Sequence, residues 1–190
     1  MRLYLFLTPI LTSFPRSGKS ATAKLADLHT FLTSTYPSPP SSSSSSQAPT
    51  SPPSFLLTSL NPLAWFLNLR TTGDIAFNPV FYGYLLVRPA PGPGSDTKEE
   101  EESKRGRKQV VLWVQKEAVT EEVRRRVEDD LEGEIREYEE AEGDLKRLAE
   151  VEGERVVGDG KVSFALANAI GVRLLLLVSF LFFFLYKAEC

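Results

Sequence analysis

Short apolar runs alternate with helix-forming segments along most of this chain, and this alternation restricts the folds open to it. The apolar runs are rich in branched and aromatic residues and predict strands at 55–59, 80–87, 109–115, 135–138 and 155–157. Helices are predicted at 20–36, 61–69, 121–131, 143–151 and 163–170. Strands that alternate with helices in this way predict a single α/β domain.

Local signals set the expected ends of several elements. Ser20 and Thr120 are expected N-caps, and Asn61 is an expected N-cap followed by Pro62 at the first helical position. Glu-Gly pairs at 132–133, 142–143 and 152–153 predict turns between short elements. These recurring glycines also argue against one long coiled coil.

Composition divides the chain into a domain and its flanking segments. Residues 1–17 are expected to be an irregular N-terminus, because the apolar stretch that starts there is interrupted and lacks a signal-peptide cleavage pattern. The domain is expected at 18–171, with disordered insertions at 37–53, rich in Ser and Pro, and at 90–107, first Pro/Gly-rich and then charged. Residues 172–190 form a hydrophobic tail.

The apolar run at 174–186 has two interpretations. It is shorter than the roughly 20 residues that a membrane-spanning helix needs. It could be a membrane tail anchor, or translated non-coding sequence at the end of a truncated gene model; the second interpretation is preferred.

Charge and cysteine content exclude some classes of protein. The formal net charge is −3, and no basic face with interleaved aromatic residues indicates nucleic-acid binding. Cys190 is the only cysteine, which excludes a disulfide framework and fits a reducing compartment, so a cytoplasmic location is expected, with a membrane as the alternative.

One stretch resembles a known family. Residues 58–84, TSLNPLAWFLNLRTTGDIAFNPVFYGY, are similar to the second N-terminal, creatinase/prolidase-like domain of cytosolic-type Xaa-Pro aminopeptidases, the aminopeptidase P family. KLADL at 24–28, VVLWV at 110–114 and KVSFALANAIG at 161–171 resemble flanking segments of the same domain. The sequence departs from the family pattern at Asn61-Pro62, where an acidic pair is usual, and by one extra residue within 70–74.

The resemblance implies a ribonuclease H-like α/β domain with a mixed sheet flanked by helices. In the full-length family this domain packs against a metallopeptidase catalytic domain that holds two divalent metals, usually manganese, and cleaves before proline. The chain is therefore expected to be a non-catalytic domain, inactive by itself, whose partner is such a catalytic domain or a second copy of the chain. The alternatives are a tail-anchored interaction module and a subunit whose catalytic half is another chain.

No catalytic or metal-ligating residues are predicted, and no cofactor is expected in this chain. The one histidine, His29, lies on the first predicted helix and is expected to be a surface or boundary residue. Residues 17–20 match the end of a phosphate-binding loop, but the first glycine that such a loop needs is absent. Arg70, Asp74 and Asn78 are candidates for the rim of a substrate cleft, although pairing of Arg70 with Asp74 and a turn at Asn78-Pro79 are the preferred explanation.

Overall fold

The computed structural model describes residues 10–11, 18–36, 52–71, 78–90, 108–151 and 153–171. Within these residues, five strands form a mixed sheet in the order β6-β5-β4-β2-β7. The strands are β2 (Ser54–Leu57), β4 (Gly83–Val87), β5 (Val110–Val114), β6 (Gly133–Glu137) and β7 (Val156–Gly158). A separate pair joins β1 (Ile10–Leu11) and β3 (Leu69–Arg70) in antiparallel register.

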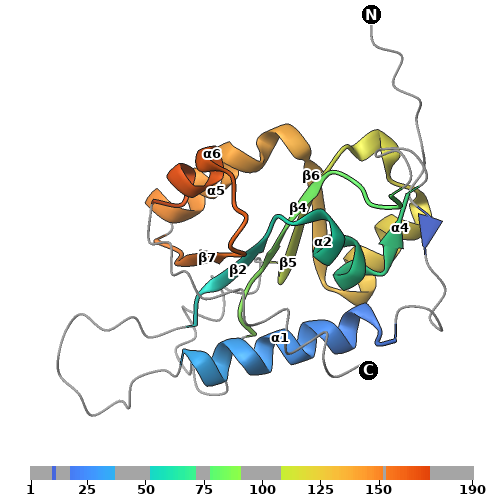
Figure 1. Cartoon of the computed structure of the whole chain (residues 1–190), viewed down its shortest axis with the longest axis horizontal. Helices are drawn as coiled ribbons and strands as arrows, with labels where there is room; N and C mark the ends of the chain where they lie inside the picture. The colour runs from blue at the N-terminus through green and yellow to red at the C-terminus, as the bar shows by residue number, and fades with distance from the viewer. Residues whose placement is uncertain are drawn as a thin grey trace, which may run out of the picture.

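Helices cover both faces of the large sheet (Figure 1). They are α1 (Ala21–Thr35), α2 (Leu60–Leu67), α4 (Glu121–Arg125) with its π-helical continuation η3 (Arg126–Asp130), α5 (Ala141–Glu150) and α6 (Phe164–Ala169). Short 3₁₀ turns follow β5 (η2, Lys116–Ala118) and β6 (η4, Tyr138–Glu140). The predicted α/β architecture, with a mixed sheet flanked by helices, is confirmed.

Side-chain alternation along the strands divides the core in two. Val110, Leu112 and Val114 of β5 join the cluster under α1, α2 and α4, whereas Val111 and Trp113 join the cluster under α5 and α6. Successive residues of a strand point to opposite faces, so a strand covered on both sides is apolar throughout. This explains the continuous run VVLWV.

Strand direction brings most strand ends to one edge. β2 runs parallel to β7, β5 runs parallel to β6, and β4 is antiparallel to both of its neighbours, β2 and β5. Consequently β2, β5, β6 and β7 end where β4 begins. We call this the C-terminal edge of the sheet, and the other end its N-terminal edge.

Most of the expected helix starts are confirmed, with one correction. The side chains of Ser20 and Thr120 accept hydrogen bonds from backbone N–H groups three residues later, as N-caps do. The expected N-cap at Asn61 is wrong: α2 begins at Leu60, with Ser59 in the capping position and no cap bond from its side chain. The physical reason is an external acceptor, Asp159, which holds the backbone before α2.

The second half of the predicted helix 121–131 contains a π-helical turn. Val123, Val127 and Leu131 are all buried in the same cluster, although residues four apart drift by about 40° per step around an ideal α-helix. The wider π turn at 126–130 compensates for this drift, because it adds residues to the turn. The i, i+4, i+8 spacing therefore produces one continuous buried face.

Other boundaries also differ from expectation. The turn expected at 142–143 is wrong, because Gly143 lies inside α5. The strand expected from residue 80 begins at Gly83. The segment 1–17, expected to be irregular, includes β1, and Pro53, expected in an insertion, is buried.

The remaining residues of the two expected insertions and the apolar tail at 174–186 lie outside the described residues. In the described part of the chain, no helix is both long enough and apolar enough to cross a membrane.

Candidate functional site

The C-terminal edge carries the connections that lead into α2 and α6, and a buried aspartate joins them. Asp159 directly follows β7 and is only 3% exposed. Its Oδ2 accepts hydrogen bonds from the backbone N–H of Thr58 (3.0 Å) and of Ser59 (2.7 Å), and its Oδ1 accepts one from Thr58 Oγ1 (2.5 Å). The carboxylate thus replaces the missing side-chain cap of α2, at the end where a helix favours negative charge.

A buried lysine holds the other end of α2. Lys24 lies on the apolar stripe of α1 and has no exposed surface. Its Nζ donates to the Trp65 carbonyl (2.6 Å) and to Asn68 Oδ1 (2.6 Å), and it lies 4.0 Å from the centroid of the Trp65 ring. Asn68 ends α2 with a φ of 55°, a left-handed conformation that asparagine tolerates better than most residues. Trp65, expected to be core, is only partly buried because it covers this ammonium group.

The predicted rim residues lie just beyond this anchor. Arg70 is half-buried on β3, where its Nη1 donates to the Leu69 carbonyl (3.1 Å), and burial lowers the pKa of its guanidinium. Asn78 Nδ2 lies 3.5 Å from Asn61 Oδ1, and its carbonyl accepts from the N–H of Val80 (2.8 Å) in a tight turn. Asp74 lies outside the described residues, so its pairing with Arg70 and the rim assignment of all three remain predictions.

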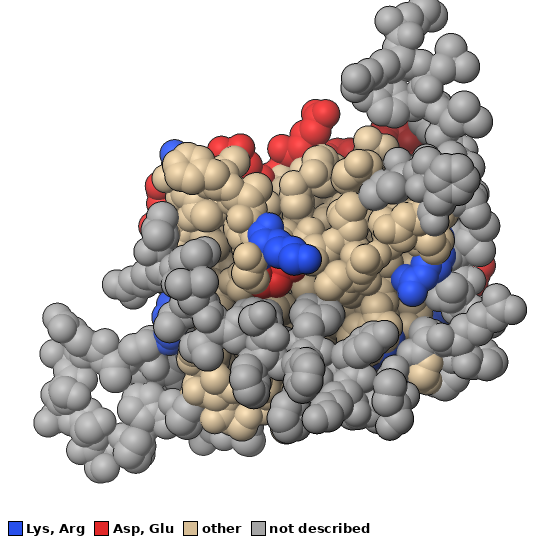
Figure 2. All heavy atoms as spheres, in the orientation of Figure 1, with Lys and Arg blue, Asp and Glu red and all other residues tan. Residues whose placement is uncertain are grey.

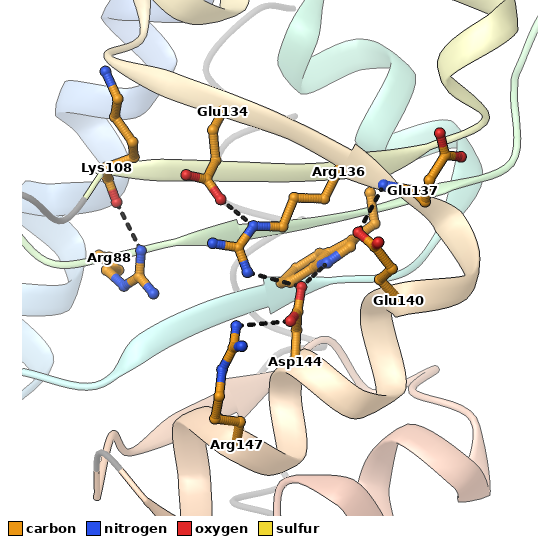
Figure 3. A network of polar contacts seen from close by, with 9 residues as sticks. Arg88, Lys108, Glu134, Arg136, Glu137, Glu140, Asp144 and Arg147 are labelled. Carbon is orange, nitrogen blue, oxygen red and sulfur yellow. Dashed lines mark hydrogen bonds and ion pairs between the residues drawn. The ribbon is translucent and has the colours of Figure 1, made fainter.

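A second polar network lies on the opposite face, between the sheet and α5 (Figure 3). Asp144 accepts hydrogen bonds from Trp113 Nε1 (3.0 Å), Arg136 Nη1 (2.8 Å) and Arg147 Nη2 (2.8 Å), and Glu134 binds the other side of Arg136. Burial acts to raise the pKa of Asp144, but the hydrogen bonds and charges of its partners outweigh burial and lower it. The same carboxylates raise the pKa of Arg136 against the effect of its own burial. The network holds α5 on the sheet.

An ion pair occupies the N-terminal edge. Arg88 Nε lies 3.1 Å from Glu154 Oε1 and its Nη1 donates to the Lys108 carbonyl (2.9 Å), while Ser54 Oγ donates to the same glutamate. The carbonyl of Arg88 lies 2.9 Å from Nε2 of His29. His29 is therefore a half-buried boundary residue on α1, and burial lowers the pKa of its imidazole. This cluster ties α1 to the ends of β2, β4, β5 and β7 where both expected insertions join the sheet.

The donor groups of the described residues do not fit a dinuclear metal centre. Such a centre needs carboxylates that bridge two ions together with a histidine. Within the described residues, no three His, Cys, Asp or Glu side chains converge as a ligand set. The buried carboxylate of Asp159 and the partly buried carboxylates of Asp144 and Glu154 are each held by arginine or backbone N–H donors.

Comparison with known families assigns the domain. A family model described as "Creatinase/Prolidase N-terminal domain" matches residues 9–176. The chain belongs to this family. The match begins upstream of the expected boundary at residue 18 and includes β1.

Several relatives of this creatinase/prolidase N-terminal domain are named as aminopeptidases. "Xaa-Pro aminopeptidase ApepP" of Drosophila melanogaster is 53% identical over 34 residues, which are 18% of this chain and 5% of the relative. "Probable Xaa-Pro aminopeptidase P" of Podospora anserina is 36% identical over 74 residues (39% and 8%), and that of Aspergillus niger is 28% identical over 123 residues (61% and 17%). The chain thus covers less than a fifth of each of these relatives.

A solved structure has the same fold. The X-prolyl aminopeptidase of Caenorhabditis elegans, described as a cytosolic enzyme with a di-nuclear active site, superposes with a TM-score of 0.62 at 18% identity. The match covers 87% of this chain and 22% of that enzyme. The likeness supports the fold of the creatinase N-terminal domain.

Sequence reasoning did not single out Asp159, Asp144 or Arg88, and it noted Lys24 and Asn68 only as matches to the family. For one of these residues, the sequence contains a signal of its burial. Lys24 lies at the i+3 position from Ala21 and the i−4 position from Leu28, in the middle of an otherwise apolar helical stripe. A charged residue there indicates a buried polar partner.

Proposed function

We propose that this creatinase N-terminal domain is the non-catalytic part of a Xaa-Pro aminopeptidase-like metalloprotein and is inactive without a catalytic domain. The family match over residues 9–176 carries this proposal, since the relatives described above are named as aminopeptidases. The chemistry of the described residues supports it, because Asp159 already accepts hydrogen bonds from backbone amides and Asp144 accepts them from arginine. Two manganese ions, expected from the family resemblance, would be held by the catalytic domain.

The proposed contribution of this domain is positional. Asp159 and Lys24 hold the two ends of α2, and β3 and the following loop leave from the end held by Lys24. Arg70, Asp74 and Asn78 would then line the rim of a substrate cleft formed together with the catalytic domain.

Peptidase assays test the inactivity. The purified chain is incubated with an X-Pro peptide and manganese, and no turnover is expected. Hydrolysis that a chelator abolishes would contradict the proposal. Addition of a family catalytic domain as a separate chain tests the alternative that the active protein is assembled from two chains.

The cellular form can be tested separately. We propose a cytoplasmic location, in line with the "cytosolic enzyme" of Caenorhabditis elegans. The alternative of a tail-anchored module rests on the apolar run at 174–186, which is shorter than a membrane-spanning helix needs. Alkaline carbonate extraction of tagged chain distinguishes them, because an anchored chain stays with the membranes. Sequencing the transcript downstream tests truncation: an in-frame catalytic domain with two Asp, one His and two Glu ligands is expected.

A further inference from the structure

Exposed aromatic side chains occur at the C-terminal edge. Among the described residues, the large hydrophobic side chains that are exposed are Tyr82 (49%), Phe164 (87%) and Val151 (77%). Tyr82 directly precedes β4, and Phe164 is the first residue of α6, shortly after the end of β7. Both positions belong to the C-terminal edge. Val151 follows α5, which runs back from the end of β6 toward the start of β7, so it lies near the opposite edge.

A pair of stacked tyrosines lies at the same edge. The rings of Tyr84 and Tyr138 are 4.8 Å apart with an interplanar angle of 19°, and their hydroxyl oxygens are 2.6 Å apart. Burial and the neighbouring hydroxyl group of Tyr84 raise the pKa of Tyr138, and Tyr82, two residues before Tyr84, adds to the shift. We call Tyr82, Tyr84, Tyr138 and Phe164 the aromatic edge.

The aromatic edge belongs to one side of the sheet. Tyr84 and Val162 both pack against the cluster under α5 and α6, and α6 contributes Leu166 and Ala169 to that cluster. In strand register, Tyr84 is paired with Trp113, whose side chain lies in the same cluster. Phe164 is thus carried by the helix layer that covers the tyrosine side of the sheet.

The surrounding surface is suited to a broad protein contact. Figure 2 shows the face between α2 and α6, where most of the described surface is uncharged, Lys or Arg and acidic atoms lie near its centre, and most other Asp and Glu side chains lie along its upper and left margins. The ends of β5 and β6 add a polar rim, because Lys116 Nζ and Glu137 Oε1 lie 3.7 Å apart there. Exposed aromatic residues inside a polar rim are typical of protein interfaces, in which Tyr and Phe are enriched.

The family match indicates which partner covers the aromatic edge. The matched segment ends at residue 176, shortly after α6 ends at Ala169, and α6 is only six residues or about 9 Å long. In family members, whatever follows this domain therefore starts close to the aromatic edge. The solved relative has most of its chain outside the matched part, which covers 22% of it. The described residues that flank both expected insertions lie at the N-terminal edge, away from the aromatic edge.

We propose that the aromatic edge is the surface on which a metallopeptidase catalytic domain docks. This assignment rests on the proposed function and adds the location of the contact. Tyr82 and Phe164 are its central anchors, and the Tyr84–Tyr138 stack is the rigid floor between the sheet and η4.

Binding in trans tests the assignment. The probe is the catalytic portion of the Aspergillus niger enzyme, prepared without the segment that this chain matches. Its affinity for the full chain is measured by calorimetry for the unchanged protein and for Tyr82→Glu, Phe164→Glu and the control Val151→Glu. All three sites are exposed, and a glutamate at the first position of α6 suits the helix N-terminus, so folding is retained and is checked by thermal melting.

The expected result is binding by the unchanged chain, about tenfold weaker binding for each edge variant, and a change of less than about twofold for Val151→Glu. Binding that all three variants retain would overturn the aromatic edge as the contact while leaving the proposed function standing. Lack of binding by the unchanged chain would overturn both. If the chain self-associates and the edge variants abolish this self-association, the aromatic edge binds a second copy of the chain and not a catalytic domain.

Discussion

Replacement of the buried Asp159 by alanine should strongly destabilise the domain. The carboxylate accepts three hydrogen bonds, from Thr58 N, Ser59 N and Thr58 Oγ1, at 3.0, 2.7 and 2.5 Å. Alanine removes the acceptor and leaves two backbone N–H groups at the start of α2 without it. Since Asp159 is 3% exposed, little water can enter in its place.

The expected cost follows from these contacts. A buried donor that loses its acceptor costs about 1–3 kcal/mol, and hydrogen bonds to charged groups lie at the upper end of the usual range. The contacts share one side chain and lie partly near the surface, so their losses do not simply add. We expect a loss of about 3 kcal/mol for Asp159→Ala. Asp159→Asn keeps one oxygen that accepts from the two backbone amides, and its side-chain NH2 group can donate to the Thr58 hydroxyl oxygen, so a loss of about 1 kcal/mol is expected.

Urea unfolding followed by circular dichroism measures both changes. The midpoint should fall while the slope stays constant, because the surface exposed on unfolding is unchanged. Asp129→Ala, at an exposed position at the end of the π turn, is the control and should stay within about 0.5 kcal/mol. A loss below about 1 kcal/mol for Asp159→Ala, or equal losses for alanine and asparagine, would refute the proposed capping of α2.

Three further predictions concern glycine positions, pH and the buried lysine. In Gly133→Ala the new Cβ would lie 2.9 Å from the Val127 carbonyl oxygen, so the free energy of unfolding should fall by about 1–3 kcal/mol. Gly143 lies inside a helix, and a Cβ added there would meet nothing within 4 Å, so Gly143→Ala should raise the free energy of unfolding by about 0.5–1 kcal/mol. Paired urea titrations check these opposite signs. His29 has a pKa in the folded state below its ordinary 6.5, so the unfolded state binds the proton more readily, and stability should fall as pH drops through 6.5 toward the folded pKa. His29→Gln should remove this part of the pH dependence. If the free energy of unfolding of the unchanged protein and of His29→Gln varies with pH in the same way, the prediction for His29 is wrong. Lys24→Met removes the ammonium donor from the Trp65 carbonyl and Asn68 Oδ1 and should cost about 2–4 kcal/mol in the same assay; a loss below about 1 kcal/mol would show that these contacts are not needed.

Strands β2 and β5 of the large sheet were predictable because both of their faces are buried. A strand covered on both sides has to be apolar at every position, and this produces runs such as VVLWV that are visible without any structure. The same is true of helices that start at a serine or threonine side chain. Ser20 and Thr120 act within three residues of their own position, so the sequence contains the whole interaction.

The two-residue strands β1 and β3 were not predictable in this way. They pair residues about sixty positions apart, and neither segment has a pattern long enough to indicate a strand. The start of α2 was misplaced for a related reason. Asn61 and Pro62 are good local signals, but the group that caps the backbone there is Asp159, at the end of the neighbouring strand β7 and 100 positions from Ser59 in the chain.

The sequence by itself determined the α/β class, the order of the main elements and the family, because these depend on local periodicity and on a run of residues with a specific pattern. Only the tertiary structure could decide which polar residues are buried and paired. Lys24, Asp159 and Asp144 have partners that are brought close by helix and sheet packing, and charge alone does not distinguish a buried ion from a solvated one. The aromatic edge also arises from this packing, because strand direction places Tyr82 and Phe164 at one end of the sheet although they lie far apart in the chain.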